Sequence, residues 1–296
     1  MKAKSVAILV VVVVVVIAAY FVARLWPYFF PSKRVIQFDA ALANAEGGFS
    51  FDRYGKALAD YVDDDGWVNY AGLKEKGEDL ETFGAMLAVL DAQVYEAWSE
   101  AEKVAFWINT YNALTLKAII DHYPITGSLP GYPKSSIRQI PGAWKALQYV
   151  VMGQKRTLDE IEHKILRAKF NEPRIHVALV CAAWSCPPLR NEPYVGGPLD
   201  KQLEDQSRRF LAMPRGLKID RDAGHVHVSS IFSWFGGDFV KTYGTDEKFA
   251  GRSETERAVL NYISGHVSDK DREYLETGDY GIKYLDYDWS LNERPN

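Results

Sequence analysis

An apolar run near the N-terminus constrains this chain more than any other feature. It extends from Ser5 to Ala23 without a charged side chain, and Lys2 and Lys4 precede it. A helix of this length measures about 28 Å, which is enough to cross the hydrocarbon core of a membrane. The run is longer than the apolar region of about 7 to 15 residues in a cleaved signal peptide, and no small-x-small cleavage site precedes Arg24. We therefore expect an uncleaved transmembrane helix.

The orientation of this helix depends on what flanks it. Basic residues lie on both sides, so the positive-inside count nearly balances, and we take the very short N-terminal tail to be cytoplasmic. The rest of the chain would then face the extracytoplasmic side, which in a bacterium means a single-pass protein of the inner membrane with its domain in the periplasm. Aromatic residues follow the run and would lie at the membrane interface: Trp26, Tyr28, Phe29 and Phe30.

The remainder of the chain has the character of a water-soluble domain. Composition is in the globular range, with 47% hydrophobic and 25% charged residues, and no second apolar run approaches a spanning length. The net charge of the whole chain is −4. Residues 1–34 carry five basic and no acidic side chains, so the rest of the chain has a net charge of −9. This argues against nucleic acid or an anionic lipid surface as the main partner. We expect an anchor and short linker at 1–34 and one globular domain at 35–296.

The strongest predicted helix is EKVAFWINTYNALTLKAIIDHYP, which Pro124 terminates. Its apolar residues form stripes on two nearly opposite sides, as expected of a helix buried on both faces. Asn109 and Asn112 lie in the middle of one stripe. An unpartnered amide there would cost about 1–3 kcal/mol, so both side chains must bind something. Neighbouring backbone and a functional group are both open as partners.

A long loop and a second helix follow. The loop PITGSLPGYPKSSIRQIPGAW is too long for a simple connector, which makes it a candidate covering loop. LQYVVMGQKR is typical of strands. In TLDEIEHKILRAKF, Thr157 and Glu160 have the spacing of a capping box, which predicts a helix start. His163 lies in the second turn of that helix, and Asp159, four residues before it, is placed to orient or charge the imidazole.

The segment IHVALVCAAWSCPPLR contains the only two cysteines. IHVALVC is apolar on both faces, which favours a central strand over Ile175–Cys181 with Cys181 at its carboxyl end, where sheets usually build sites. Pro187 ends the strand, so Cys186 would lie in a turn. Two cysteines five residues apart could form a disulfide across that turn in an oxidising compartment. They are too few for zinc or an iron–sulfur cluster without other ligands.

Several other kinds of chemistry have no sequence support. The chain has no Gly-x-Ser-x-Gly, no phosphate-binding glycine loop, no dinucleotide fingerprint and no His-Glu-x-x-His. We expect no cofactor and no metal, and interpret the pair His225 and His227 as structural. The pair Asp286 and Asp288 is better explained by capping and arginine pairing than by acid–base chemistry, and a closing strand would place it. Three further residues are interpreted as packing and capping residues: Trp234, Asp238 and Trp289.

Five ordered motifs carry a resemblance to a known family. FWINTYNAL, LDEIEHKILR, ALVCAAWSCPPLR, SSIFSWFGGDF and YLDYDWSLN lie between about Tyr54 and Asn292. Together they resemble the family named only as domain of unknown function 547 (DUF547), found in bacterial envelope proteins and in plant proteins. The resemblance implies that the site contains the two asparagines, the Glu162-His163 pair and Cys181. It also implies that serine often replaces Cys186, so Cys181 is the expected site thiol and a disulfide is not required.

Two functions from different classes fit these residues. In the first, the chain is a non-catalytic envelope module whose buried cluster organises a cleft for a small-molecule or protein ligand beneath the loop 124–144. In the second, it is a thiol-dependent hydrolase or acyl transferase of papain-like or transglutaminase-like character. Cys181 would then be the nucleophile, His163 the base, and Asn109 or Asn112 the group that orients the imidazole or stabilises an oxyanion. The order of these residues inverts the papain order.

The expected fold is a single mixed domain of α+β or α/β class behind the transmembrane helix. We expect a central mixed sheet that includes Ile175–Cys181 and a buried helix, Phe106–Ile120, packed against it.

Overall fold

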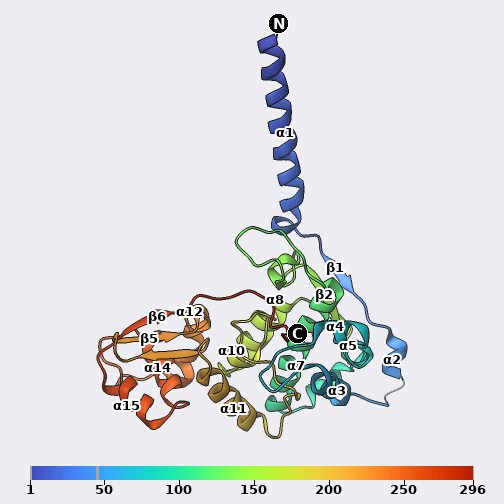
Figure 1. Ribbon diagram of the computed structural model, residues 1–296. Coiled ribbons are helices and arrows are strands. Elements are labelled where there is room, and N and C mark those ends of the chain that lie inside the picture. Colours follow the sequence, from blue (N-terminus) through green and yellow to red (C-terminus); the bar gives the residue numbers. More distant parts are fainter. Residues whose placement is uncertain (1, 45–46, 296) are drawn as a thin grey trace.

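A computed structural model describes residues 2–44 and 47–295, and Figure 1 shows its arrangement. Helix α1 (Lys2–Phe29) projects from the rest of the chain, and its last two turns contact the loop 124–144. Among the described residues, one helix, over Val12–Phe29, is long and apolar enough to cross a membrane by length and composition. Most of its described side chains are exposed to the surroundings, Val12–Val16 among them, whereas Leu25 and Tyr28 are half-buried. The predicted apolar helix is therefore present.

The chain passes from α1 into the first sheet within a few residues. Strand β1 (Arg34–Ile36) pairs in parallel with β2 (Leu147–Val151), and β2 pairs antiparallel with β3 (Gln154–Arg156). The Arg34 N–H donates to the carbonyl of Ala146 at 2.9 Å. The predicted strand character of LQYVVMGQKR is confirmed as a hairpin, whose two-residue turn has both φ angles positive. Only residues 30–33 separate α1 from this sheet, so the segment between them is short.

The first and larger core surrounds α7 (Glu100–His122). Ser99 and Glu102 form a capping box at its start, and it ends one residue before the Tyr123-Pro124 bond, which confirms the predicted helix and its termination. Sixteen of its residues are buried, consistent with two apolar faces. The other helices of this half are α2 (Ala40–Asn44), α3 (Asp52–Tyr61), α4 (Tyr70–Glu75), α5 (Glu78–Val89), α6 (Ala92–Glu96), η1 (Ile137–Gln139), α8 (Leu158–Glu160), η2 (Ile161–Leu166), α9 (Arg167–Lys169) and α10 (Ile175–Ala178).

The predicted central strand over Ile175–Cys181 is wrong. Residues 175–178 form the short helix α10, Leu179 after it is extended, and residues 179–181 belong to no strand. An apolar run buried on all sides does not by its periodicity distinguish strand from helix. Here side chains make the hydrogen bonds to the backbone that a neighbouring strand would make in a sheet. Asn112 binds the backbone at Ala178 and Val180, and Gln206 donates to the carbonyl of Val177 at 3.0 Å.

A second core lies beside the first and contains the other sheet. In this sheet β5 (His225–Val228) pairs antiparallel with β4 (Leu217–Asp220) and parallel with β6 (Gly281–Tyr284). The helices around it are α12 (Ser230–Phe235), η3 (Gly236–Phe239), α13 (Val240–Tyr243), α14 (Glu254–Ser264) and α15 (Asp269–Thr277). The fold is therefore mixed α/β, about 51% helical, with two small sheets in place of the predicted central one.

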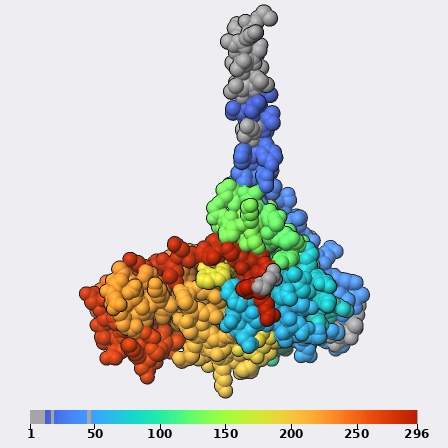
Figure 2. Space-filling view, in the orientation of Figure 1, coloured from blue at the N-terminus to red at the C-terminus, as the bar shows by residue number. Residues whose placement is uncertain are grey.

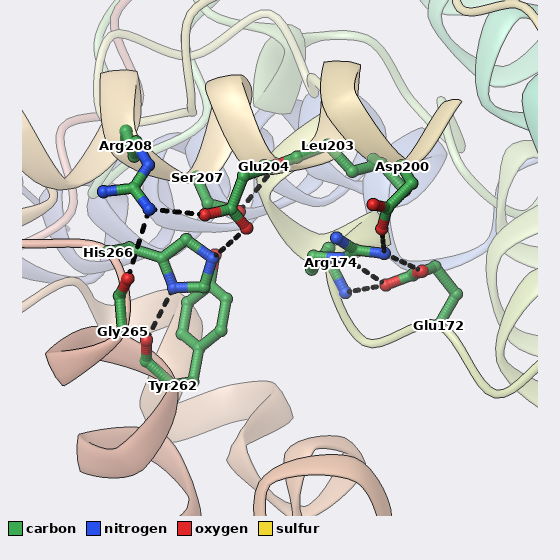
Figure 3. A network of polar contacts seen from close by, with 10 residues as sticks. All are labelled: Glu172, Arg174, Asp200, Leu203, Glu204, Ser207, Arg208, Tyr262, Gly265 and His266. Atoms are coloured by element: carbon green, nitrogen blue, oxygen red, sulfur yellow. Dashed lines mark hydrogen bonds and ion pairs between the residues drawn. The ribbon is translucent and has the colours of Figure 1, made fainter. Parts of the chain in front are cut away.

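Helix α11 (Leu199–Ala212) joins the two cores. Its first half contributes Leu203 to the first core, and its second half contributes Phe210 to the second. Ion pairs extend from the same helix in both directions, as Figure 3 shows: Asp200 binds Arg174 at 2.9 Å, and Glu204 binds the buried His266 at 2.8 Å. The two halves of the domain are thus held by one continuous element.

The C-terminal segment also joins the two halves. It returns from the second to the first as the dark red coil that runs from β6 to the C-terminus in Figure 1. The Trp184 N–H donates to the carbonyl of Ser290 at 2.6 Å, and the Leu291 N–H donates to that of Ser135 at 3.0 Å. Asp288 accepts a hydrogen bond from the Ser290 N–H two residues further on. The segment closes the fold through such bonds and isolated bridges, in place of the predicted closing strand.

Candidate functional site

A pocket of about 850 Å³ lies where the two cores meet the loop 124–144 and the end of α1. Its volume is in the range of roughly 300–1,000 Å³ typical of small-molecule sites. The loop contributes one wall, in agreement with its predicted covering role; in Figure 2 this segment is green and lies at the base of α1. The pocket is lined by Tyr28, Phe29, Pro31, Tyr111, Leu129, Pro130, Tyr132, Arg138, Ile140, Gly142, Ala143, Trp144, Lys145, Asp159, Glu162, His163, His176, Leu179, Cys181, Cys186, Ile231, Trp234, Phe235, Tyr287 and Trp289.

The loop keeps its shape through one buried side chain, Gln139. Its amide nitrogen donates to the carbonyls of Leu129, Tyr132 and Pro133, and its amide oxygen accepts from the Leu129 N–H at 2.7 Å. Gly142 has φ of +71°, and a Cβ there would lie 2.4 Å from that of Ala146, so only glycine fits at this point of the wall. The wall is therefore a defined structure although it contains little regular secondary structure.

The two cysteines meet at the pocket wall. Both are free thiols, and their Sγ atoms are 2.7 Å apart. The Tyr287 hydroxyl lies 3.1 Å from the Cys186 Sγ and 3.4 Å from the Cys181 Sγ, and the Cys181 main-chain N–H donates to the Cys186 Sγ at 3.1 Å. Cys181 is partly exposed, whereas Cys186 is buried. The turn that brings them together is the one that the prolines were predicted to impose.

The two thiols differ in acidity. Burial raises the pKa of Cys186, but hydrogen bonds from Cys181 and Tyr287 outweigh it and hold that pKa below its usual value. Cys181 has a raised pKa because its thiol donates to Cys186 and lies largely removed from water, although the residue is partly exposed. A thiolate would therefore form first on Cys186, with Cys181 as its neighbour on the more exposed side.

Glu162 and His163 lie in η2, a π-helical stretch within the longer helix that runs from Leu158 to Lys169. Thr157 and Glu160 form the predicted capping box at its start. π-helical turns are often found at functional sites. Burial raises the pKa of Glu162 to about 7, against the opposing effects of Tyr111 and Arg167. A carboxyl that titrates near neutral pH inside a pocket is a candidate acid or base.

His163 is held as a neutral ring. An Arg167 guanidinium N–H donates to its Nδ1 at 2.8 Å, so the ring proton lies on Nε2, which is 3.8 Å from an Asp159 carboxylate oxygen. Burial lowers the pKa of His163, and the Asp159 carboxylate opposes burial without offsetting burial and the Arg167 charge together. Because the Nδ1 lone pair is engaged, the imidazole has no free basic nitrogen in this arrangement.

A second histidine, His176, was not predicted as a site residue. It is buried at the start of α10, stacks on Phe235 with ring centroids 4.2 Å apart, and contacts an Asp238 carboxylate oxygen at 2.8 Å through Nε2. Asp238 also binds Arg167 through two hydrogen bonds of 2.6 and 2.9 Å. Arg167 and His176 hold the pKa of Asp238 well below its usual range against the effect of burial. Asp238 thus links both histidines to the pocket wall, which is more than a capping role.

Two tryptophans that were interpreted as packing residues also line the pocket. Trp234 is half exposed, and its ring stacks on that of Trp289 at 6.1 Å. Asp238 and Trp234 both belong to the motif SSIFSWFGGDF. No local pattern identifies their roles, because the partners of Asp238 are 62 and 71 residues away and the Trp289 ring on which Trp234 stacks is 55 residues away.

Asn109 and Asn112 bind backbone. Asn109 makes a pair of hydrogen bonds with the N–H and carbonyl of Tyr194, at 2.9 and 2.7 Å. Asn112 does the same across Val180 and Ala178, at 2.9 and 3.0 Å. Both side chains are buried and neither lines the pocket. The sequence left two kinds of partner for these amides, neighbouring backbone or a functional group, and in the structure both bind backbone. Asn112 thereby fixes the segment that leads into Cys181.

The structure therefore brings Cys181 and His163 to one pocket and leaves the two asparagines behind its wall. No hydrogen bond in the described part of the chain joins either imidazole in the pocket to either thiol. Nor do residues 2–44 and 47–295 contain a group of three or more His, Cys, Asp or Glu side chains placed to hold a metal ion. What the site offers is a thiol pair, a carboxyl of near-neutral pKa and a wall of aromatic and basic side chains.

These features define a mixed α/β protein with a thiol- and histidine-lined pocket between two cores. Residues 95–211 match the family described as "Protein of unknown function, DUF547", which confirms the resemblance for this part of the chain. The matched segment runs from the end of α6 to α11 and includes both asparagines, Glu162, His163 and both cysteines. No curated protein and no solved structure matches the chain.

Proposed function

We propose that this chain is a membrane-anchored, extracytoplasmic module that binds a small-molecule ligand in the pocket between its two cores. The observation that carries the proposal is the pocket itself: about 850 Å³, with apolar and aromatic walls and a few convergent polar groups, as in known ligand sites. The buried asparagines support its walls, since they hold the backbone at Tyr194 and Val180. Binding requires no reaction at the thiols.

The anchor part of the proposal rests on the length and apolarity of α1. We expect the full chain to partition with membranes, and a chain truncated to begin near Val35 to be a folded, acidic, soluble protein. The structure adds a refinement. A start at Lys33 keeps strand β1 whole, because the strand begins at Arg34. The chain that starts at Lys33 should therefore unfold at a higher temperature than the chain that starts at Val35.

Orientation is tested with protease added to intact spheroplasts that contain the full chain. An extracytoplasmic domain should be digested without lysis. Complete protection, with digestion only after lysis, would contradict the proposed orientation and place the domain in the cytoplasm. In a reducing cytoplasm a disulfide between Cys181 and Cys186 would also not persist.

The second candidate is the thiol-dependent hydrolase or acyl transferase. One observation favours it: hydrogen bonds converge on the Cys186 Sγ beside the more exposed Cys181, at the wall of a pocket that also holds Glu162 and His163. Either thiol would act as the nucleophile, and a proton would pass to Glu162 or to His163 once Arg167 releases it. The binding candidate ranks first because the pocket has no imidazole bound to a thiol among the described residues.

A further inference from the structure

Arg138 differs from the other charged side chains of the pocket. Its guanidinium carbon lies 4.0 Å from the ring centroid of Trp289, 4.9 Å from that of Trp144 and 5.2 Å from that of Tyr132. Its Nε is buried without a hydrogen-bond partner, and no ion pair to it occurs among the described residues. A guanidinium held by aromatic stacking keeps its N–H edges available for an anion.

The other basic side chains at this site are already paired. Lys145, which lines the pocket, lies 3.7 Å from Asp159, and Arg167, which stands outside the lining, is bound by Asp238 at 2.6 Å. Arg138 is therefore the pocket cation without a carboxylate neighbour in the part of the chain that the structure describes. A guanidinium that is partly removed from water and unpaired favours a ligand that brings a negative charge.

The end of α1 forms the other border of this pocket. Tyr28, Phe29 and Pro31 line it, and the Tyr28 hydroxyl donates to the carbonyl of Gln139 at 3.3 Å. One turn earlier, the Arg24 Nε donates to the Ser128 hydroxyl at 2.7 Å, so the loop is held against the helix. Figures 1 and 2 show the loop packed at the base of α1. Tyr28 and Phe29 are the last residues of the apolar span.

We infer that the pocket binds an amphiphile that has an apolar body and an acidic head group, and that the head group binds Arg138. The ligand would come from the membrane surface, so this inference rests on the proposed membrane anchor. The end of the span places the pocket at the level of the membrane interface, where such molecules reside. Apolar side chains of the loop and α1, including Leu129 and Phe29, suit the apolar body. This is recognition of one anion in a pocket, which the overall acidity of the domain does not oppose.

The test uses the full chain in phosphatidylcholine vesicles with cis-parinaric acid, a fluorescent long-chain carboxylic acid. Its binding is followed by energy transfer from tryptophan, because Trp144, Trp234 and Trp289 all line the pocket. We expect saturable quenching in the wild type. Arg138→Gln should weaken binding about 10- to 100-fold, as expected for loss of a charge-assisted hydrogen bond. Arg138→Lys should recover part of the affinity.

Three controls give the test its specificity. The methyl ester of the probe lacks the negative charge, so its affinity for the wild type should be no higher than that of the acid for Arg138→Gln. Acetate lacks the apolar body and should not compete with the acid for the wild type. Arg221→Gln removes an arginine that stacks on Tyr274 outside the pocket, and it should leave binding unchanged. Equal binding of acid and ester, or competition by acetate at similar concentration, would overturn the inference.

Failure of this inference can be distinguished from failure of the proposed function. If the full chain does not float with the vesicles, the anchor is wrong. If the chain floats, and Cys181 reacts in the folded protein, but no saturable quenching occurs, then the pocket is open and only the assignment of its ligand is wrong. Thermal unfolding of Arg138→Gln shows whether that variant keeps its fold, and Arg138→Lys carries the comparison if it does not.

Discussion

Asn112→Ala is expected to lower the free energy of unfolding by about 3 to 5 kcal/mol, because it strands two buried main-chain groups and leaves a cavity. The Asn112 side chain is the hydrogen-bond partner of the Ala178 carbonyl and the Val180 N–H, where no strand replaces it. Urea denaturation of the full chain in mild detergent, followed by near-ultraviolet circular dichroism, measures the loss. The pocket should loosen as well, because this backbone leads into Cys181.

The matched control for this change is Asn171→Ala. Asn171 is exposed and donates only to the Thr242 hydroxyl at 3.2 Å, so its replacement should change the free energy of unfolding by less than about 0.5 kcal/mol. If the two alanine variants were equally stable, Asn112 would not be holding the segment, and our explanation of why it is not a strand would be wrong.

Glu162→Gln is expected to remove a pH dependence of stability worth about 3 kcal/mol. Burial raises the pKa of Glu162 from 4.5 to about 7 in the folded protein. Between these two values the folded protein keeps a proton that the unfolded chain has released, so the wild type loses stability as pH rises. Below pH 4.5 both states are protonated, and above pH 7 the loss is complete. The advantage of the glutamine variant over the wild type should grow across this window.

This expectation is measured as the difference in unfolding free energy between wild type and variant at pH 4.5, 6 and 8. Taking the difference cancels the titration of other groups. Glu247→Gln, at an exposed position, should show a difference that does not depend on pH. A flat difference for Glu162→Gln would mean that this carboxyl is not buried beside Tyr111 and would remove it as an acid or base of the pocket.

Local signals in the sequence predicted the elements that local chemistry determines. The capping box at Thr157, the termination of α7 before Pro124 and the strand character of LQYVVMGQKR all appear in the structure, because each depends on residues a few positions apart. The long loop was also predicted to cover a site, since its length and composition allowed few other roles.

Elements that depend on distant partners could not be predicted in this way. The hydrogen bonds of the backbone at Ala178 and Val180 are made by Asn112, which lies 66 and 68 residues earlier in the sequence. No local signal marks such a distant partner, so the apolar pattern of the segment was interpreted as a strand. Asp238 reaches Arg167 from 71 residues away, and this pairing places His176 at the pocket. The two-core arrangement likewise depends on α11 and the returning C-terminal segment, which have no short-range signature.

The most direct test of the proposed pocket is the alkylation of its thiols in the native protein. The full chain is reduced, freed of reductant and treated with iodoacetamide near neutral pH, and the modified cysteine is identified by mass spectrometry over time. An open pocket predicts modification of Cys181 in the folded protein, ahead of the buried Cys186. Reaction as fast as that of an ionised thiol would favour the acyl-transfer candidate, and slower reaction would favour binding alone. Silence of both thiols until denaturant is added would contradict the pocket and leave the cysteines as packing residues.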